Sequence, residues 1–532
     1  MDCTATYLSY SKTNQFSSLV NDYLEQSPNI KDFYEHPVSV EGIKQAVLSR
    51  KGFNTDRRLL VRTIKKIYQS TTLSPLQEKN LDALASENTF TICTAHQPNI
   101  FTGYLYFIYK IIHAIKLADD LNIQLPAYRF VPVFYMGSED NDLDELSQVN
   151  LNGVKLSWET GQSGAVGRMK VDKKLLQLTG FIEGQLGVEP YGKEVVDILK
   201  NCYKEGLSVA EATFSLINTL FAEYGLLVLL PDNADLKQKM QKVFEDDLLK
   251  HKAYEIVSET GKALEDQYKV QVNPREINLF YLEENSRERI ERNNGSFHVL
   301  NSTQHFKTDE ILQLLQSHPD RFSPNVVLRG LYQEMILPGV AFIGGGSEIA
   351  YWLELKKLFN YYNVPYPVLV LRNSFLILNS EQREKIEQMG FSVEDMFQPD
   401  AELLNQLVKR ESENKLTLLD EKAAIQKIYR ELSEKAGAID KTLLQYIAAL
   451  ETEALKGIDN LEKKMLRAEK RKYETQQRQL QKIKAELFPG DGLQERIDNF
   501  MPWYAKLGKK FLEDLYTHSP ALEQQFTVLE YH

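Results

Sequence analysis

The chain has 532 residues, which is too long for a single hydrophobic core and predicts more than one domain. Hydrophobic residues make up 43% of the chain and aromatic residues 10%, values typical of a packed globular protein and not of a disordered one. A formal net charge of −11 argues against broad binding to nucleic acid or to anionic membranes, so neither is an expected partner.

The cysteines and the N-terminus indicate a cytoplasmic protein. Cys3, Cys93 and Cys202 lack any CxxC or other ligand-like spacing, which disfavours a disulfide scaffold and a cysteine-based zinc site. The N-terminal stretch has neither the basic nor the apolar region of a signal peptide. The longest purely aliphatic run, residues 226–230, has the length of a buried strand and is far too short to span a membrane.

The first ninety residues are predicted to be mostly helical, with breaks at Pro28, Pro37 and Pro75. Beyond them, apolar strands alternate with helices. Strands are predicted at 89–95, 130–136, 225–230, 341–343 and 366–372, and helices at 104–122, 210–224 and 348–359. Strands that are apolar throughout and separated by helices favour a parallel sheet covered on both faces, which is a Rossmann-like α/β core.

Residues 415–487 predict an α-helical antiparallel coiled coil, because apolar residues recur there at alternating spacings of three and four and proline is absent. Gly437 offers a helix stop and Asp440 an N-cap for the next helix. The second helix is the longer one, so part of its apolar stripe lacks a partner within the hairpin. A second copy of the chain is the simplest partner, which makes a homodimer the expectation.

These patterns divide the chain into three parts. We expect a Rossmann-like core at 1–380, with a helical N-terminal region and insertions at about 150–300. A coiled-coil domain is expected at 381–500. The remaining C-terminal segment, 501–532, is expected to pack back on the core.

A turn between the first strand and the following helix combines several ligand-binding residue types. His96, Gln97 and Asn99 follow the strand, and Thr102 and Gly103 precede the helix. Ligands of parallel α/β sheets bind beyond the carboxyl ends of strands, where helix N-termini present free N–H groups to anions. Gly103 would let the backbone approach a ligand, and Thr102 could cap the helix or bond phosphate. We favour a ligand site over the alternative, which is a capped turn whose histidine forms its hydrogen bonds within the protein.

The second strand runs into SEDNDLDE at 138–145, which holds five carboxylates in eight residues. Clustered carboxylates repel one another, so they form a solvated loop unless a cation or an amine compensates them. At a strand end, Glu139, Asp140 or Asp142 could hold a substrate ammonium, bind Mg²⁺ or act as a general base. Some of them are expected to be site residues, and the sequence leaves open which.

A glycine run, Gly344-Gly345-Gly346, connects the fourth strand to a helix that carries Glu348 in its first turn. The run would admit a carboxylate or phosphate close to the helix N–H groups, although a tight turn with an N-cap explains it equally well. It matches neither GxGxxG nor GxxxxGK[ST].

Two arginines stand near predicted strand ends. Arg329 lies upstream of the glycine run together with Gln333, and Arg372 follows the fifth strand together with Asn373. Either arginine could clamp a carboxylate or phosphate bidentately, and a structural ion pair is an equal alternative. The chain has no HExxH helix, GxSxG elbow or Cys/His cluster, so hydrolysis by those routes is not expected.

The chain resembles the family of bacillithiol biosynthesis cysteine-adding enzymes in segments that follow one another in the same order over nearly its whole length. The segments are CTAHQPNIFTGYLYFIYKIIHAIKLA, VPVFYMGSEDNDLDEL, SPNVVLRGLYQEMILPGVAFIGGGSEIAYWLELK, VLVLRNSF and KKMLRAEKRK…LFPGDGLQERIDNFMPWY. The resemblance implies a Rossmann-like core similar to class I aminoacyl-tRNA synthetases and nucleotidylyltransferases, with a coiled-coil domain that mediates dimerisation. It also implies that cysteine is joined by an amide bond to the amino group of glucosaminyl malate.

Amide formation from a free carboxylate and an amine requires an activated acyl group, normally made from ATP, so ATP or ADP with Mg²⁺ is an expected ligand, and zinc is not. In our hypothesis Glu139, Asp140 or Asp142 holds the cysteine ammonium. His96, Asn99 and the helix start at 102–103 would stabilise charge on acyl or phosphate oxygens, and His96 or a carboxylate would deprotonate the amine. Arg329 or Arg372 would clamp the malate carboxylates. The alternatives are a nucleotidylyltransferase-like enzyme acting on another substrate, and a non-catalytic coiled-coil scaffold with a degenerate nucleotide-binding core.

Overall fold

The computed structural model describes residues 2–414 and 416–532, which fall into two compact units. The larger unit contains residues 2–11, Gln15–Ile377 and Gly492–Tyr531. The smaller unit contains Lys12–Asn14, Leu378–Asp491 and His532. Within the described ranges no helix is long and apolar enough to cross a membrane.

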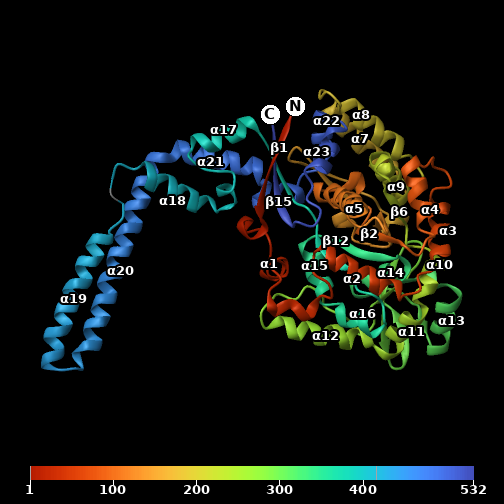
Figure 1. Ribbon diagram of the computed structural model, residues 1–532, viewed down its shortest axis with the longest axis horizontal. Helices are drawn as coiled ribbons and strands as arrows, with labels where there is room; N and C mark the ends of the chain where they lie inside the picture. The colour runs from red at the N-terminus through yellow and green to blue at the C-terminus, as the bar shows by residue number, and fades with distance from the viewer. Residues whose placement is uncertain (1, 415) are drawn as a thin grey trace. The chain divides into compact units, whose positions relative to one another are not determined.

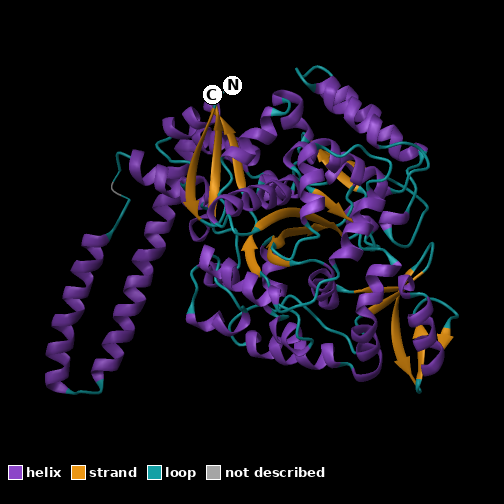
Figure 2. Ribbon diagram, turned by 45° about the vertical axis from the view of Figure 1, so that its right-hand side comes forward, coloured by secondary structure: helices purple, strands orange, loops and turns teal. Residues whose placement is uncertain are grey.

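A five-stranded sheet forms the centre of the larger unit, and all its strands run parallel in the order β13–β12–β2–β3–β6. Its strands are nearly completely buried, and helices lie on both sides of it (Figure 2). All five predicted strands are therefore present, with shifts of a few residues at their ends. Their bounds are Thr89–His96 for β2, Arg129–Met136 for β3, Leu227–Leu229 for β6, Gly339–Gly344 for β12 and Val368–Leu371 for β13.

The order of the strands reverses beside β2. From β2 the chain continues through helix α5, Leu105–Gln124, to β3 and later to β6, whereas β12 and β13 lie on the other side of β2. Helix α5 packs against both β2 and β3 and is buried along most of its length, which explains its apolar sequence. Open α/β sheets bind ligands in the crevice beyond the carboxyl ends of the strands at such a reversal.

Helices α2 (Val40–Lys51), α14 (Val326–Ile336), α15 (Gly346–Leu353) and α16 (Lys356–Tyr361) also belong to this unit, and the predicted helix at 348–359 corresponds to the last two. The other helices of at least seven residues are α1 (Ser18–Leu24), α3 (Arg57–Ile67), α4 (Pro75–Ala83), α7 (Lys173–Leu186), α8 (Gly192–Cys202), α9 (Val209–Phe221), α11 (Gln241–Lys250), α12 (Lys252–Glu265), α13 (Thr308–Ser317), α22 (Met501–Leu507) and α23 (Lys510–Thr517).

Three further sheets were not predicted. In the first, β1 (Cys3–Ser9) pairs antiparallel along its whole length with β15 (Gln525–Tyr531), which is also a neighbour of β14 (Phe375–Asn379). The two chain ends consequently lie side by side (Figure 1). The first ninety residues are mostly helical as predicted, except for β1. The other two sheets are a hairpin of β4 (Gln148–Leu151) and β5 (Val154–Ser157), and a sheet with the order β10–β9–β8–β7–β11, built from β7 (Leu279–Leu282), β8 (Arg287–Asn293), β9 (Ser296–Val299), β10 (His305–Phe306) and β11 (Phe322–Pro324).

The smaller unit is helical and contains the predicted antiparallel hairpin, formed by α19 (Leu419–Ile439) and α20 (Leu443–Lys470). Lys422 on α19 bridges the two helices through ion pairs with Asp459 at 2.7 Å and Glu462 at 2.6 Å on α20. The prediction of a helix stop at Gly437 is wrong, because α19 continues to Ile439. The remaining helices are α17 (Ser380–Gln388), α18 (Asp400–Glu411) and α21 (Glu474–Leu487).

Candidate active site

A cavity of about 540 Å³ lies at the carboxyl ends of the parallel strands, next to the reversal in strand order. Residues that follow β2, β3, β12 and β13 line it, together with side chains from α5, α14 and β8. Its volume is within the range of small-molecule binding sites. The predicted site residues that line it are His96, Gln97, Glu139, Asp140, Arg329, Gly345, Glu348 and Arg372.

The structure places the other predicted residues outside the lining, namely Asn99, Thr102, Gly103, Asp142, Gln333, Gly344 and Asn373. Asp142 is exposed and caps a short helix by accepting a hydrogen bond from the Glu145 backbone N–H at 3.2 Å. Asn373 is fully buried and its amide donates to Ser519 and to the carbonyl of Pro520. These side chains support the site from behind or face away from it.

Several lining residues were not predicted, among them Tyr106, Lys110, Arg287, Tyr351 and Arg496. Lys110 lies in the middle of α5 and is 2% exposed, and its ammonium donates to the carbonyl of Ala95 at 2.9 Å. A lysine surrounded by apolar helix residues is a signal that could have identified it, because charged side chains are rarely buried without a partner. Arg287 comes from β8 in the insertion, and no local pattern marks it.

His96 ends β2 and is held by aromatic rings. Its imidazole meets Tyr106 and Phe107 edge to face, with ring centroids 5.3 and 5.4 Å away. Its Nε2 atom is buried without a hydrogen-bond partner among the described residues. Burial lowers the pKa of His96 well below its usual value, and the positive charges of Lys110 and Arg372 lower it further. His96 is therefore a neutral imidazole at neutral pH.

The turn after His96 has an unusual backbone. Phe101, Thr102 and Gly103 have φ angles of 50°, 68° and 63°, a region that side-chain-bearing residues rarely adopt. Gly103 is required there, since a Cβ atom would lie 2.9 Å from the Asn99 side chain. The Asn499 amide fixes this conformation by donating to the carbonyls of Phe101 and Gly103. Strained backbone of this kind persists where the surrounding structure determines it, and it is common at functional sites.

Most cations of the cavity already have a carboxylate partner. Lys110 pairs with Glu348, and Arg372 pairs with the fully buried Glu495 at 2.7 Å. Glu348 also accepts a hydrogen bond from the Gly345 N–H at 2.8 Å and thereby caps its own helix. The protein's own carboxylate therefore occupies part of the glycine turn that we expected to receive an anionic ligand.

Arg329 differs from these cations. Throughout residues 2–414 and 416–532 it forms no ion pair with a carboxylate, and its guanidinium donates only to Gln333 Oε1 at 3.3 Å and to the Tyr351 hydroxyl at 2.5 Å. It lies 5.6 Å from the ring centroid of Tyr135 and 5.8 Å from that of Phe342. A partly desolvated guanidinium that forms no ion pair favours an anionic ligand, and a carboxylate matches its fork geometry.

Gln333 connects Arg329 to a buried ion pair. Its amide donates to Glu334 Oε1 at 2.9 Å while its own oxygen accepts from Arg329. Glu334 in turn pairs with Arg50 of α2, and neither side chain of that pair is more than 1% exposed. The predicted substrate contact of Gln333 is thus replaced in the structure by a contact that orients Arg329.

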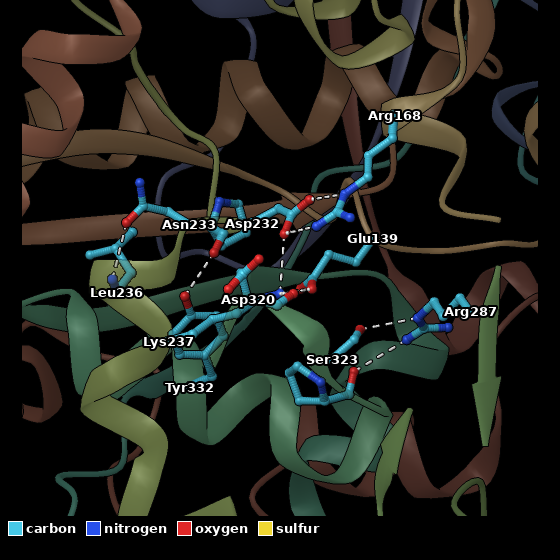
Figure 3. A network of polar contacts seen from close by, with 12 residues as sticks. Glu139, Arg168, Asp232, Asn233, Leu236, Lys237, Arg287, Asp320, Ser323 and Tyr332 are labelled. Carbon is cyan, nitrogen blue, oxygen red and sulfur yellow. Dashed lines mark hydrogen bonds and ion pairs between the residues drawn. The ribbon is translucent and has the colours of Figure 1, made fainter. Parts of the chain in front are cut away.

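Two carboxylates of the acidic run face the cavity with different partners. Asp140 accepts from the Gln97 amide at 3.0 Å, which joins the ends of β2 and β3, and it lies 3.7 Å from Arg287. Glu139 pairs with the fully buried Lys237 (Figure 3). Burial raises the pKa of Glu139, and Lys237 offsets part of that effect.

The parallel sheet, the cavity beyond its strand ends and the helical hairpin define a Rossmann-like α/β protein with an added coiled-coil domain. The chain matches two family models, the N-terminal Rossmann-like domain of bacillithiol biosynthesis BshC over residues 1–373 and its C-terminal coiled-coil domain over residues 375–531. The chain therefore belongs to the bacillithiol biosynthesis BshC family. This confirms both the resemblance and the predicted fold class.

Relatives match over nearly their entire length. A protein of Flavobacterium psychrophilum is 38% identical over 98% of this chain and 99% of its own, and one of Flavobacterium johnsoniae is 38% identical with the same coverage. A protein of Cytophaga hutchinsonii is 35% identical over 95% of this chain and 94% of its own. All three carry the name "Putative cysteine ligase BshC".

Proposed function

We propose that this protein is a cysteine ligase of bacillithiol biosynthesis, which joins the carboxyl group of cysteine to the amino group of glucosaminyl malate. The observation that carries the proposal is the Arg329 guanidinium, which forms no ion pair with any described residue, in a cavity that also contains Glu139 and Asp140. One cavity therefore offers a cation for carboxylates and carboxylates for an ammonium group. The name of the relatives supports the same activity.

Three groups of the two substrates have a counterpart in the cavity. Arg329 would bind a carboxylate of the malate moiety, and Glu139 or Asp140 would hold the cysteine ammonium. The Nε2 atom of His96, which has no hydrogen-bond partner among the described residues, would accept the proton that the sugar amine must lose before it attacks the acyl carbon.

The cysteine carboxylate must also be activated, and we propose ATP with Mg²⁺ as the co-substrate that supplies this activation. The cavity provides phosphate-binding cations in Lys110, Arg372 and the exposed Arg496. Lys110 and Arg372 already pair with carboxylates, so a phosphate would bind beside those ion pairs.

Replacing His96 tests the proton-acceptor role. The His96→Ala variant is expected to lower kcat by about 100- to 10,000-fold, the usual contribution of a general base. His96→Phe keeps a ring against Tyr106 and Phe107 but has no nitrogen, and it should be equally inactive. Circular dichroism and Tm should match the wild type for His96→Phe. A normal yield of coupled thiol from this variant would contradict the assignment.

The reaction itself is tested with purified protein, cysteine and glucosaminyl malate, with and without Mg·ATP, by mass spectrometry of the coupled thiol. We expect product only when ATP is present, with AMP or ADP released in equal amount. Failure under both conditions with folded protein would overturn the proposed function. Pyrophosphate release that does not depend on cysteine would indicate a nucleotidylyltransferase instead.

We also propose that the α19–α20 hairpin mediates a homodimer, because Ile428 and Leu432 on α19 and Leu461 on α20 expose large apolar side chains. The double variant Ile428→Glu/Leu432→Glu is expected to sediment with the mass of one chain where the wild type has the mass of two. Coupling activity at high enzyme concentration serves as the control for folding. A wild type that sediments as a single chain at micromolar concentration would contradict the proposal.

A further inference from the structure

Behind the cavity, four charged side chains form a chain of contacts near the ends of β3 and β6, in the order Arg168, Asp232, Lys237 and Glu139 (Figure 3). Arg168 binds Asp232 bidentately, with its Nε at 2.7 Å from Oδ2 and its Nη2 at 2.8 Å from Oδ1. Lys237 binds Asp232 Oδ1 at 3.1 Å and pairs with Glu139. Two positive and two negative charges make the network neutral when Glu139 is ionised.

Lys237 has no capacity left for a ligand. Its ammonium has three N–H donors, and three acceptors surround it, namely Glu139, Asp232 and the carbonyl of Asp320 at 3.0 Å. The side chain is 0% exposed and ends the short helix α10, Ala234–Lys237, which Asn233 caps by accepting from the Leu236 N–H at 3.1 Å. Lys237 is therefore unable to touch a molecule in the cavity.

Glu139 is in the opposite situation. It lines the cavity, and in the part of the chain that the structure describes no residue other than Lys237 forms an ion pair with its carboxylate. A carboxylate accepts about four hydrogen bonds, so most of its capacity remains for a molecule bound in the cavity. Glu139 is thus anchored to Lys237 while its side chain lines the cavity.

We propose that Lys237 is a positioning residue that holds Glu139 ionised and directed into the cavity for the substrate ammonium, and that Arg168 and Asp232 fix Lys237 in turn. The inference rests on the proposed function, because that function assigns the ammonium of cysteine to this carboxylate. It identifies one of the two cavity carboxylates, Glu139, as the ammonium ligand.

The charges of the network predict the direction in which the pKa of Glu139 moves when one of its neighbours is removed. Burial raises the pKa of Glu139, Lys237 lowers it and Asp232 raises it. Removing Lys237 leaves two carboxylates with one guanidinium, which favours a proton on Glu139. Removing the charge of Asp232 leaves two cations with one carboxylate, which favours the ionised form. The groups that face Glu139 are Lys237, Asp232, Arg168, Arg287, Tyr135 and Tyr332.

Two variants of this network are expected to shift the pH profile in opposite directions. Activity should fall as pH drops through the pKa of Glu139, because the protonated carboxyl cannot bind an ammonium. In Lys237→Met this acid limb of kcat/KM for cysteine should move to higher pH by about 1–3 units, and in Asp232→Asn it should move to lower pH. A purely structural role would reduce activity in both variants without opposite shifts.

The experiment uses the full-length protein. Infrared difference spectra of the carboxyl band, with Glu139→Gln as the blank, report the protonation of Glu139 without any reaction. Lys239→Met is the matched control, since Lys239 forms a half-exposed pair with Asp56 at 2.5 Å outside the network and should leave the acid limb unchanged.

The proposal is overturned if folded Lys237→Met and Asp232→Asn both keep the wild-type acid limb of kcat/KM and the wild-type infrared midpoint. If Lys237→Met does not fold, the direction of the shift in Asp232→Asn decides alone. Opposite infrared shifts in a protein that makes no coupled thiol would overturn the proposed function and leave the electrostatic role of Lys237 standing.

Discussion

Replacing Arg329 with glutamine is expected to cost about 2–5 kcal/mol of binding free energy for the acidic acceptor, the usual loss when one partner of a buried charged contact is removed. This corresponds to a decrease in kcat/KM of roughly thirty-fold to several thousand-fold. The decrease should appear mainly in the KM for glucosaminyl malate, because the KM for cysteine depends on other groups. Steady-state kinetics with each substrate varied in turn measures the difference.

Two controls separate the charge of Arg329 from its geometry. Arg329→Lys keeps a positive charge without the bidentate fork and should have intermediate kcat/KM. Arg289→Gln changes an exposed arginine of β8 and should leave the kinetics unchanged. An acceptor without carboxylates, such as a methyl glucosaminide, should be an equally poor substrate for the wild type and for Arg329→Gln. An unchanged KM for glucosaminyl malate in Arg329→Gln would refute the role of this residue.

Glu334→Ala is expected to lower the free energy of unfolding by about 3–5 kcal/mol, because it leaves the Arg50 guanidinium buried without its counter-charge. Arg50 would keep its hydrogen bonds to the backbone carbonyls of Gly339, Glu334 and Pro365, which are too weakly charged to replace a carboxylate. Denaturant titration followed by circular dichroism measures the change.

Two comparison variants test whether the burial of the Arg50–Glu334 ion pair causes this loss of stability. Glu183→Gln breaks an exposed pair with Lys200 and should change the free energy of unfolding by no more than about 1 kcal/mol. The double variant Arg50→Met/Glu334→Met removes both charges and should recover much of the lost stability, since paired burial of charge is itself costly. Equal stability of Glu334→Ala and the wild type would show that the pair contributes little.

The strands and the strand ends could be predicted from the sequence, because an apolar run of strand length followed by polar residues is a local signal. His96, Gln97, Glu139, Asp140 and Arg372 lie at strand ends and line the cavity for that reason. The direction of a side chain is not a local property. Asn373 follows the same strand as Arg372, yet its amide is buried against Ser519, which is 146 residues away in sequence.

Other contributors to the cavity depend on contacts between distant segments. Lys110 reaches the cavity only because α5 packs against β2 and places it beside Glu348. Arg287 belongs to an inserted sheet whose strands have a weaker sequence signal than those of the parallel sheet. Lys237 contacts Glu139 because β3 and β6 are neighbours in the parallel sheet. These pairings are set by topology, which a single sequence specifies only through the complete fold.

The pairing of β1 with β15 has a consequence for biosynthesis of the protein. β1 is synthesised long before its partner strand β15, and Asn499, which holds the turn after His96, follows Phe101 of that turn by 398 residues. At about 5–20 residues per second, the segment between β1 and β15 takes roughly half a minute to two minutes to synthesise. During that interval β1 has no partner strand, and the turn after His96 lacks the hydrogen bonds from Asn499. A product truncated before Asn499 would therefore lack both the partner strand of β1 and the amide that holds the turn after His96.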